Sequence, residues 1–271
     1  MLKKIGIVGC GTIGSFIAKA VDNELKSFAK IAGLCDIDNE RAVDLCKTLS
    51  QKPPIVSISR LIDSSDIVVE AASGRASFDL TREVLLNKKD VLVMSIGGLL
   101  GKSEELFAIA RKNRAKIILP SGAICGLDGI KSAGIGSVTK VTLTTRKPPK
   151  GLRGAPYIIE NGIDLDAITN EYVIFEGTAQ KAVQAFPKNI NVSALLSIAG
   201  IGAEKTIVKI VTSPEYTVNV HEVEVEGDFG KLLTRTENVP SPQNPKTSFL
   251  APLSAVSALR QYLDDSVKIG A

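Results

Sequence analysis

The stretch that decides the fold runs from Ile5 to Gly14 and reads IGIVGCGTIG. A short apolar run precedes three glycines, and apolar residues at helical spacing follow them, so the pattern predicts a strand, a tight turn and a helix. In this context Gly9 would permit the turn, Gly11 would let a pyrophosphate approach the backbone, and Gly14 would let the helix pack closely on the strand. The stretch therefore predicts a dinucleotide-binding βα unit. The alternative is a glycine-rich turn that holds no ligand.

An acidic residue ends the second predicted strand. Asp36 follows the last glycine of the motif by about twenty residues, where a carboxylate can accept hydrogen bonds from an adenosine ribose. Such a carboxylate favours NAD over NADP because it would repel a 2′-phosphate, whereas Arg41 could compensate that repulsion. In the other interpretation Asp36 only shapes the turn, while Asp38 caps the next helix. We expect Thr12 and Ile13, which open the first helix, to join the glycines at the cofactor.

Between about Lys3 and Leu119, short apolar runs alternate with helical patterns. The runs do not alternate with polar residues, which is typical of parallel strands covered by helices on both faces. Two segments rich in small residues follow these runs, Glu70–Gly74, which includes Ala71 and Ser73, and Ser95–Gly98. At the carboxyl edge of an open α/β sheet they would leave room for a nicotinamide ring, although they could equally be ordinary loop residues.

After Pro120 the β-rich segments become longer and alternate in polarity, which predicts an antiparallel or mixed sheet with one exposed face. These segments are Val138–Thr145, Lys205–Thr212, Thr217–Glu226 and Lys231–Thr236. Helical stretches from about Ala179 to Ala185 and from Val192 to Ala199 would cover the other face. A last helical pattern, between Phe249 and Leu263, could return to the first domain.

We therefore expect an α/β protein with a Rossmann-type doubly wound parallel sheet and a second, α+β domain. Residues 1–119 would form the dinucleotide-binding domain, completed by the C-terminal helix within 247–271. Residues 120–246 would form a domain for substrate binding and dimerisation, because an exposed sheet makes a homodimer plausible.

Composition narrows the class of protein. The chain has 271 residues, of which 44% are hydrophobic and 23% are charged, as in an ordinary globular protein. Its net charge of +4 is spread along the sequence, aromatic residues make up only 4% and Trp is absent, so we expect no nucleic-acid partner. No apolar run approaches the roughly 20 residues that span a bilayer, so we expect no membrane contact and a cytoplasmic location.

The chain has four cysteines, and they lack the spacing of metal ligands and the density of a disulfide framework. We expect them to be buried apolar residues in a reducing compartment, and we expect no bound metal.

His221 is the only histidine, so a reaction that needs an imidazole must use it. It lies in an alternating run that would place it on the same strand face as Asn219 and Val223. The residue alone would equally suit a solvent-facing or hydrogen-bonded core histidine. A basic turn, Arg146–Lys150 with Arg153, could bind a dicarboxylate or a cofactor phosphate, or it could be a solvated loop.

The chain resembles the L-aspartate dehydrogenase family, whose fold is similar to those of homoserine dehydrogenase and dihydrodipicolinate reductase. Five segments carry the resemblance: Gly9–Gly14, Pro120–Asp128 (PSGAICGLD), Thr144–Pro149 (TTRKPP), Phe186–Val192 (FPKNINV) and Val220–Val223 (VHEV). They follow one another in the family's order and extend over nearly the whole chain.

The resemblance implies a reaction and three site residues. Ala123 and Asn189 would contact the nicotinamide cofactor, NAD or NADP, and His221 would be the active-site residue. The reaction would be oxidative deamination of L-aspartate to oxaloacetate and ammonia through iminoaspartate, which could feed NAD biosynthesis. With an ordinary pKa near 6.5, His221 could accept the amine proton at neutral pH.

Two substrate carboxylates require anion contacts, and Lys188 and Asn191 are candidates because they lie in matched segments. Lys188 could also be surface charge, and Asn191 could cap the helix that begins near Val192.

Two other functions are also compatible with the sequence. Lys205 and Lys209 keep a homoserine-dehydrogenase-like or other reductase possible, whereas a dihydrodipicolinate-type reductase would need a histidine pair that this chain lacks. A protein that binds NAD(P) as a sensor, without turnover, would share the same fold.

Overall fold

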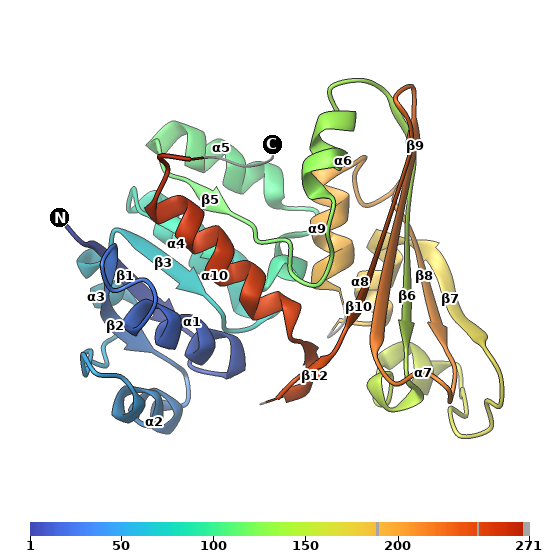
Figure 1. The fold of residues 1–271 in the computed structure, drawn as a ribbon, viewed down its shortest axis with the longest axis horizontal. Helices are drawn as coiled ribbons and strands as arrows, with labels where there is room; N and C mark the ends of the chain where they lie inside the picture. The colour runs from blue at the N-terminus through green and yellow to red at the C-terminus, as the bar shows by residue number, and fades with distance from the viewer. Residues whose placement is uncertain (188–189, 243, 268–271) are drawn as a thin grey trace. The chain divides into compact units, whose positions relative to one another are not determined.

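The computed structural model describes residues 1–187, 190–242 and 244–267 (Figure 1). Contacts between Cα atoms divide the chain into two units. One unit comprises Met1–Pro120 with residues 251–267, and the other comprises Ser121–Leu250. Each unit has its own hydrophobic core.

The first unit contains a five-stranded sheet in the order β2-β1-β3-β4-β5, and all its neighbouring strands are parallel. The strands are β1 (Lys3–Val8), β2 (Ala29–Cys35), β3 (Ile67–Glu70), β4 (Asp90–Val93) and β5 (Ile117–Ile118). The order reverses between β1 and β3, which is the point where open α/β sheets bind ligands at their carboxyl edge. The predicted Rossmann-type parallel sheet is therefore confirmed.

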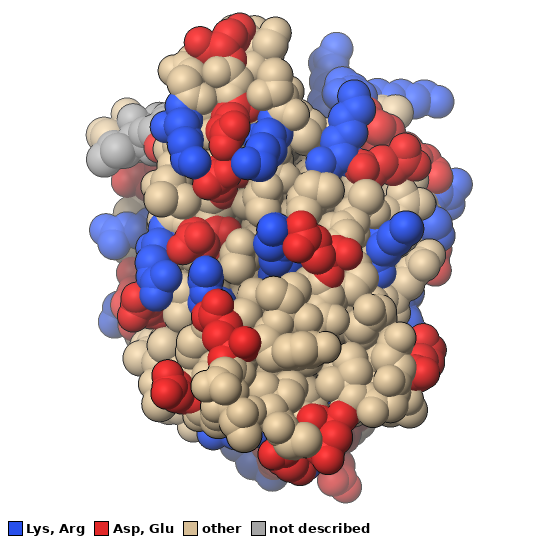
Figure 2. Space-filling view, turned by 90° about the vertical axis from the view of Figure 1, so that its right-hand side faces the viewer, with Lys and Arg blue, Asp and Glu red and all other residues tan. Residues whose placement is uncertain are grey.

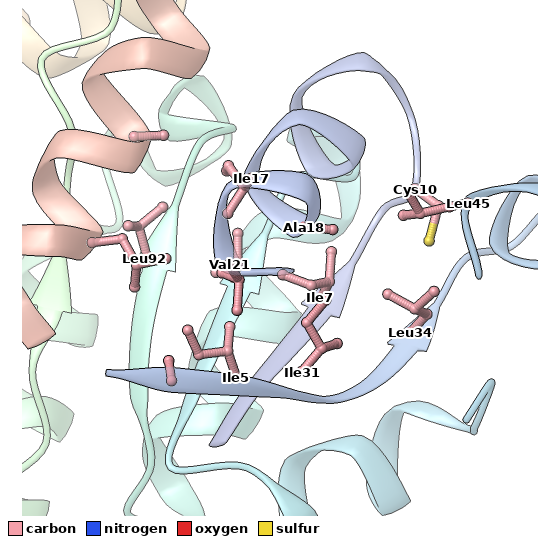
Figure 3. Close-up of a cluster of buried hydrophobic side chains, with 14 of the residues drawn as sticks. Ile5, Ile7, Cys10, Ile17, Ala18, Val21, Ile31, Leu34, Leu45 and Leu92 are labelled. Atoms are coloured by element: carbon pink, nitrogen blue, oxygen red, sulfur yellow. The ribbon is translucent and has the colours of Figure 1, made fainter. Parts of the chain in front are cut away.

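Helices cover both faces of this sheet. They are α1 (Thr12–Asp22), α2 (Asn39–Thr48), α3 (Ile58–Ser64), α4 (Gly74–Leu86), η1 (Ile96–Leu99), α5 (Ser103–Asn113) and α10 (Leu250–Leu263). On one face, Ile17 and Val21 of α1 pack with Ile5 and Ile7 of β1 (Figure 3). On the other face lies Gly6, where an added Cβ would come within 2.8 Å of Leu61 in α3. Because both faces are covered from Ile5 onward, the residues of β1 from Ile5 to Val8 are apolar or small.

The C-terminal helix belongs to the core of the first unit. Ala255 and Leu259 of α10 are fully buried in the same cluster as Ile5 and Leu92. Near the end of the helix, the Tyr262 hydroxyl donates to an Asp90 carboxylate oxygen at 2.7 Å. The apolar stripe predicted between Phe249 and Leu263 therefore packs on residues from the other end of the chain.

The second unit contains a mixed sheet in the order β10-β9-β6-β8-β7, in which only the β6–β8 pair is parallel. Its strands are β6 (Val138–Lys147), β7 (Tyr172–Thr178), β8 (Ile207–Thr212), β9 (Asn219–Gly227) and β10 (Gly230–Asn238). A hairpin follows, formed by β11 (Pro240–Ser241) and β12 (Asn244–Ser248). The expectation of a mixed or antiparallel second sheet is confirmed.

One face of the second sheet carries the helices and the core. The helical segments are α6 (Leu127–Ala133), η2 (Pro149–Gly151), α7 (Pro156–Glu160), α8 (Ala179–Ala185) and α9 (Asn191–Ala199). Val141 and Leu143 of β6 and Val223 of β9 are buried against this layer, together with Phe186. Along β6 and β9 these inner positions alternate with outward-facing ones that are mostly polar, as the sequence predicted.

The opposite face of this sheet carries charged side chains of both signs, which interleave in Figure 2. Lys140 pairs with Glu224 at 2.8 Å and with Glu226 at 3.1 Å, and Lys231 pairs with Glu224 at 2.8 Å. Because opposite charges lie across neighbouring strands, this face balances its charge locally.

Among the described residues, no helix is long and apolar enough to cross a membrane.

Candidate functional site

Two glycines of the turn after β1 are required by the fold of the first unit itself. Gly9 has φ +92°, and a Cβ there would lie 2.4 Å from the carbonyl oxygen of Ala71. A Cβ on Gly14 would lie 1.8 Å from the carbonyl oxygen of Gly9. Neither contact can be made by a real side chain, so these glycines allow α1, the turn and the segment after β3 to meet.

Gly11 differs from Gly9 and Gly14 because a side chain at this position would not clash with the rest of the protein. Its φ is −73°, and a Cβ there would have no described atom within 4 Å. It precedes α1, whose first turn has neither a capping side chain nor an acidic residue. Open space beside helical N–H groups fits a pyrophosphate, whose approach a Cβ would obstruct. Thr12 and Ile13 are the first two residues of α1, and Ile13 packs against the core.

The Asp36 side chain stabilises the glycine-rich turn after β1 by hydrogen bonds to backbone N–H groups. Its carboxylate accepts from the Cys10 backbone N–H at 2.6 Å and from the Asp38 N–H at 2.9 Å. The expected capping by Asp38 is confirmed, because its side chain accepts from the Glu40 N–H at 3.2 Å. Arg41 pairs with Asp38 at 3.1 Å on the exposed start of α2. A carboxylate has more acceptor positions than these two bonds use, so Asp36 can shape the turn and still accept from a ribose.

Glu70, at the end of β3, lies in the segment that the sequence placed at the carboxyl edge, but the role of its carboxylate was not predicted. Its fully buried carboxylate accepts from the backbone N–H groups of Ala72 and Ser95, both at 2.9 Å, and from the Ser77 hydroxyl at 3.2 Å. Burial raises the pKa of Glu70, although these hydrogen bonds oppose the shift. Through these hydrogen bonds Glu70 connects the segment that follows β3 with the segment that follows β4. Its only sequence signal is an acidic residue that closes an apolar run.

The two small residues expected at this edge lie on the segment that Glu70 holds. Ala71 is half-buried and forms the close contact with Gly9, whereas Ser73 is exposed and precedes α4. The Ser73 side chain makes no capping hydrogen bond, so capping of α4 does not explain this serine.

His221 lies on the inner face of the second sheet, near the start of β9. It is only 5% exposed, and its Nδ1 lies 3.0 Å from the hydroxyl of Thr145, which is directly opposite on β6. Burial, followed by the positive charge of Lys147, lowers the pKa of His221 to about 3. The expected ordinary pKa near 6.5 is therefore wrong, because a charged imidazole would be desolvated here beside another cation.

Ala123 is connected to the strand that carries His221 by hydrogen bonds from β10. Its carbonyl oxygen accepts from the Thr236 hydroxyl at 2.8 Å and from the Asn238 side-chain amide at 3.0 Å. Thr236 of β10 is the residue opposite His221 in the β9–β10 pair. The structure thus joins two residues that lie almost a hundred positions apart in the sequence through one threonine.

The other predicted site residues lie on the segment before α9, at the start of α9 and near β8. Lys188 and Asn189 lie outside the described residues. Asn191 is exposed and is the first residue of α9, and the capping position belongs to Ile190. The interpretation of Asn191 as a helix cap is therefore wrong by one position. Lys205 is exposed, and Lys209 pairs with Glu176 at 2.9 Å.

The basic turn divides between the two faces of the second sheet. Arg146 pairs on the outer face with Glu222 at 3.5 Å, whereas Lys147 points inward and is 7% exposed. Arg153 is exposed and pairs with Asp166. Successive residues of a strand face opposite sides, so Arg146 and Lys147 cannot bind the same anion on one face of the sheet, and the guanidinium site for a dicarboxylate or a phosphate stays a prediction.

Two family models match the chain. Residues 128–262 match the model described as aspartate dehydrogenase, C-terminal, and residues 9–120 match the NAD binding domain of homoserine dehydrogenase. The L-aspartate dehydrogenase of Methanosarcina mazei is 48% identical over 98% of this chain and 99% of its own length. That of Nitrosopumilus maritimus is 44% identical over 99% of this chain and 100% of its own length.

Solved structures give the same fold. The aspartate dehydrogenase of Thermotoga maritima matches with a TM-score of 0.69 and 23% identity, over the full length of both chains. A homoserine dehydrogenase from Thiobacillus denitrificans matches with a TM-score of 0.62 and 14% identity, covering 99% of this chain and 76% of that one. Together with the NAD-binding model, these matches assign an NAD(P)-binding Rossmann domain to this chain.

The different surroundings of the glycines predict different effects of substitution. Gly11→Ala should weaken NAD binding by about tenfold or more, equivalent to about 1.4 kcal/mol, because its Cβ enters the space that a pyrophosphate would occupy. It should lower the free energy of unfolding by at most about 1 kcal/mol, as expected for a capping position. Gly14→Ala should instead destabilise the protein by about 1–3 kcal/mol or more. Calorimetric NAD titration and urea unfolding measure both effects. Equal loss of stability in the two variants would contradict this assignment.

The buried imidazole predicts a pH dependence of stability. Because the pKa of His221 is lower in the folded protein than in the unfolded chain, the unfolded chain takes up the proton first as pH falls. The free energy of unfolding should therefore decrease from about pH 6.5 toward about pH 3, by at most about 1.4 kcal/mol per pH unit from this residue. His221→Gln should remove that contribution. Urea unfolding at several pH values measures the difference, and a difference between the two proteins that does not vary with pH would refute the prediction.

Proposed function

We propose, because the chain belongs to the L-aspartate dehydrogenase family, that it oxidises L-aspartate to iminoaspartate, which water converts to oxaloacetate and ammonia. The observation that carries this proposal is 48% identity to an L-aspartate dehydrogenase over essentially the full length of both chains. The product could supply NAD biosynthesis.

The first unit would hold the cofactor. The open space at Gly11 and the N–H groups of Thr12 and Ile13 would receive the pyrophosphate, with Gly9 and Gly14 allowing the turn. When bound, NAD(P) supplies the acceptor for the hydride that leaves the substrate Cα.

Other residues would complete the cofactor site. Asp36 would accept from the adenosine ribose, which favours NAD, although Arg41 keeps NADP possible. Ala71 and Ser73 would border the nicotinamide, and Ala123 and Asn189 would contact the cofactor, as the family resemblance implies. Glu70 would fix the segment that carries Ala71 and Ser73.

His221 would act as the base toward the substrate amine and then toward the water that attacks the imine. Its low pKa leaves the imidazole neutral at neutral pH, with a lone pair available, but also makes it a weak base, so the role as base requires surroundings that raise this pKa when substrate is bound. When its Nδ1 carries the proton, that N–H donates to the Thr145 hydroxyl and Nε2 bears the reactive lone pair. Lys188 and Asn191 remain candidates for contacts with the substrate carboxylates.

We also propose a homodimer in the cytoplasm. The support for the dimer is the exposed face of the mixed sheet, which presents charges of both signs in rows. Such a face can pair with a second copy of itself about a two-fold axis, since each row offers complementary charges.

The direct test is turnover by the purified protein. L-Aspartate with NAD or NADP should produce reduced nicotinamide, measured by its absorbance, whereas L-homoserine and L-glutamate should produce at most a small fraction of that rate. Turnover of L-homoserine instead would support a homoserine-dehydrogenase-like reductase. Binding of NAD without turnover of any of the three substrates would support a sensor.

His221→Ala should lower the turnover number for L-aspartate by about 10²- to 10⁴-fold, the usual contribution of a general base. Its dissociation constant for NAD should stay within about twofold of the wild-type value, because the glycine turn belongs to the other unit. Steady-state kinetics and calorimetry measure the two quantities. Near-normal turnover by a folded variant would remove His221 from the mechanism.

A further inference from the structure

The buried lysine of the basic turn is not used by the function proposed so far. Lys147 is the last residue of β6, two positions after Thr145, so its side chain shares the inner face with the Thr145–His221 pair. Only 7% of it is exposed. Its backbone carbonyl accepts from the buried Thr212 hydroxyl at 2.8 Å, which fixes the strand where the side chain enters the interior.

Lys147 borders a cavity of about 440 Å³ within the second unit. The cavity is lined by apolar groups, including Leu152 and Phe186, and by the polar side chain of Asn219. Lys150 and Arg153 also line it, whereas no Asp or Glu does so among the described residues. A space of this size with cationic groups on an apolar wall suits a small anion.

The charge of Lys147 reaches the imidazole. Burial lowers the pKa of Lys147 to about 8, so the ammonium group is still mostly protonated at neutral pH. Its positive charge is one of the two causes of the low pKa of His221. A carboxylate that enters the cavity would interact favourably with this charge, because charge-assisted hydrogen bonds are among the stronger ones.

We propose that Lys147 binds one carboxylate of the substrate in this cavity. Asn219, which also lines the cavity, lies two positions before His221 on the same strand, so a substrate held there would lie on the side of His221. The inference rests on the proposed function, which supplies a dicarboxylate as substrate. Lys147 suits the task better than its neighbours, because Arg146 lies on the outer face and Arg153 is exposed and paired with Asp166. The bound carboxylate would also screen the lysine charge and so raise the pKa of His221 when substrate is present.

The single histidine makes this proposal measurable without turnover. Succinate has the two carboxylates of L-aspartate but no amine, so it can bind and cannot be oxidised at an amine-bearing carbon. In protein labelled at histidine, the imidazole signals in an NMR spectrum belong to His221 alone. Succinate should shift these signals in the wild-type protein in a saturable manner. The absence of any shift at saturating succinate would overturn the proposal.

The decisive variant is Lys147→Met, with Lys140→Met as the matched control on the outer face of the same strand. Lys147→Met should weaken succinate binding and raise the KM for L-aspartate by about 30-fold or more, as expected for the loss of a buried charge partner. Its NAD affinity and free energy of unfolding should be retained, because an apolar side chain of similar length replaces a buried charge. Lys140→Met should bind succinate as the wild-type protein does.

The two proposals fail in distinguishable ways. A wild-type protein that never oxidises L-aspartate, but binds succinate through Lys147, would contradict the proposed function and leave the carboxylate site intact. Normal succinate binding by folded Lys147→Met would overturn the carboxylate site even if L-aspartate is the substrate. A pure loss of kcat at unchanged KM would also overturn it, because that result assigns Lys147 to the chemical step.

Discussion

The fold of the first unit depends on the lack of a Cβ atom at two positions, Gly9 and Gly14. At Gly9 and Gly14, the backbone of the turn, the first turn of α1 and the segment after β3 approach to distances that no side chain permits. This approach places the start of α1 at the point where the strand order reverses. Asp36 and Glu70 then fix the surrounding segments through backbone N–H groups. The glycines at these two positions are structural, and their neighbour Gly11 is the one whose small size serves a ligand.

In the second unit, chemistry depends on the alternation of side chains along β6 and β9. Thr145 and His221 face each other because the two strands are in register, and their polar pair lies among buried apolar residues. The same alternation separates Arg146 from Lys147 and so distributes one basic sequence between an outer, ion-paired face and an inner, apolar one. Burial then gives the inward groups their properties: it lowers the pKa values of both His221 and Lys147.

Much of this fold follows from sequence patterns that are local. The glycine motif, the parallel strands and the helix Ala179–Ala185 could be predicted because each depends on neighbouring residues and on strict periodicity. The strand β7 (Tyr172–Thr178) was missed because a register irregularity between Val173 and Phe175 breaks its alternation. The predicted end of β6 at Thr145 fell two residues short, since Arg146 and Lys147 read as a basic turn. Features that arise from distant segments, such as the network around Glu70, have no comparable signal.

The discontinuous first unit has a consequence for how the protein is made. Its core includes Ala255 and Leu259, which a ribosome adds only after every strand of the second unit has been synthesised. The second unit can close its sheet while the nascent first unit still exposes the apolar surface that α10 will cover. We therefore expect the amino-terminal half to be the later of the two to reach its final stability during translation, despite being the first to leave the exit tunnel.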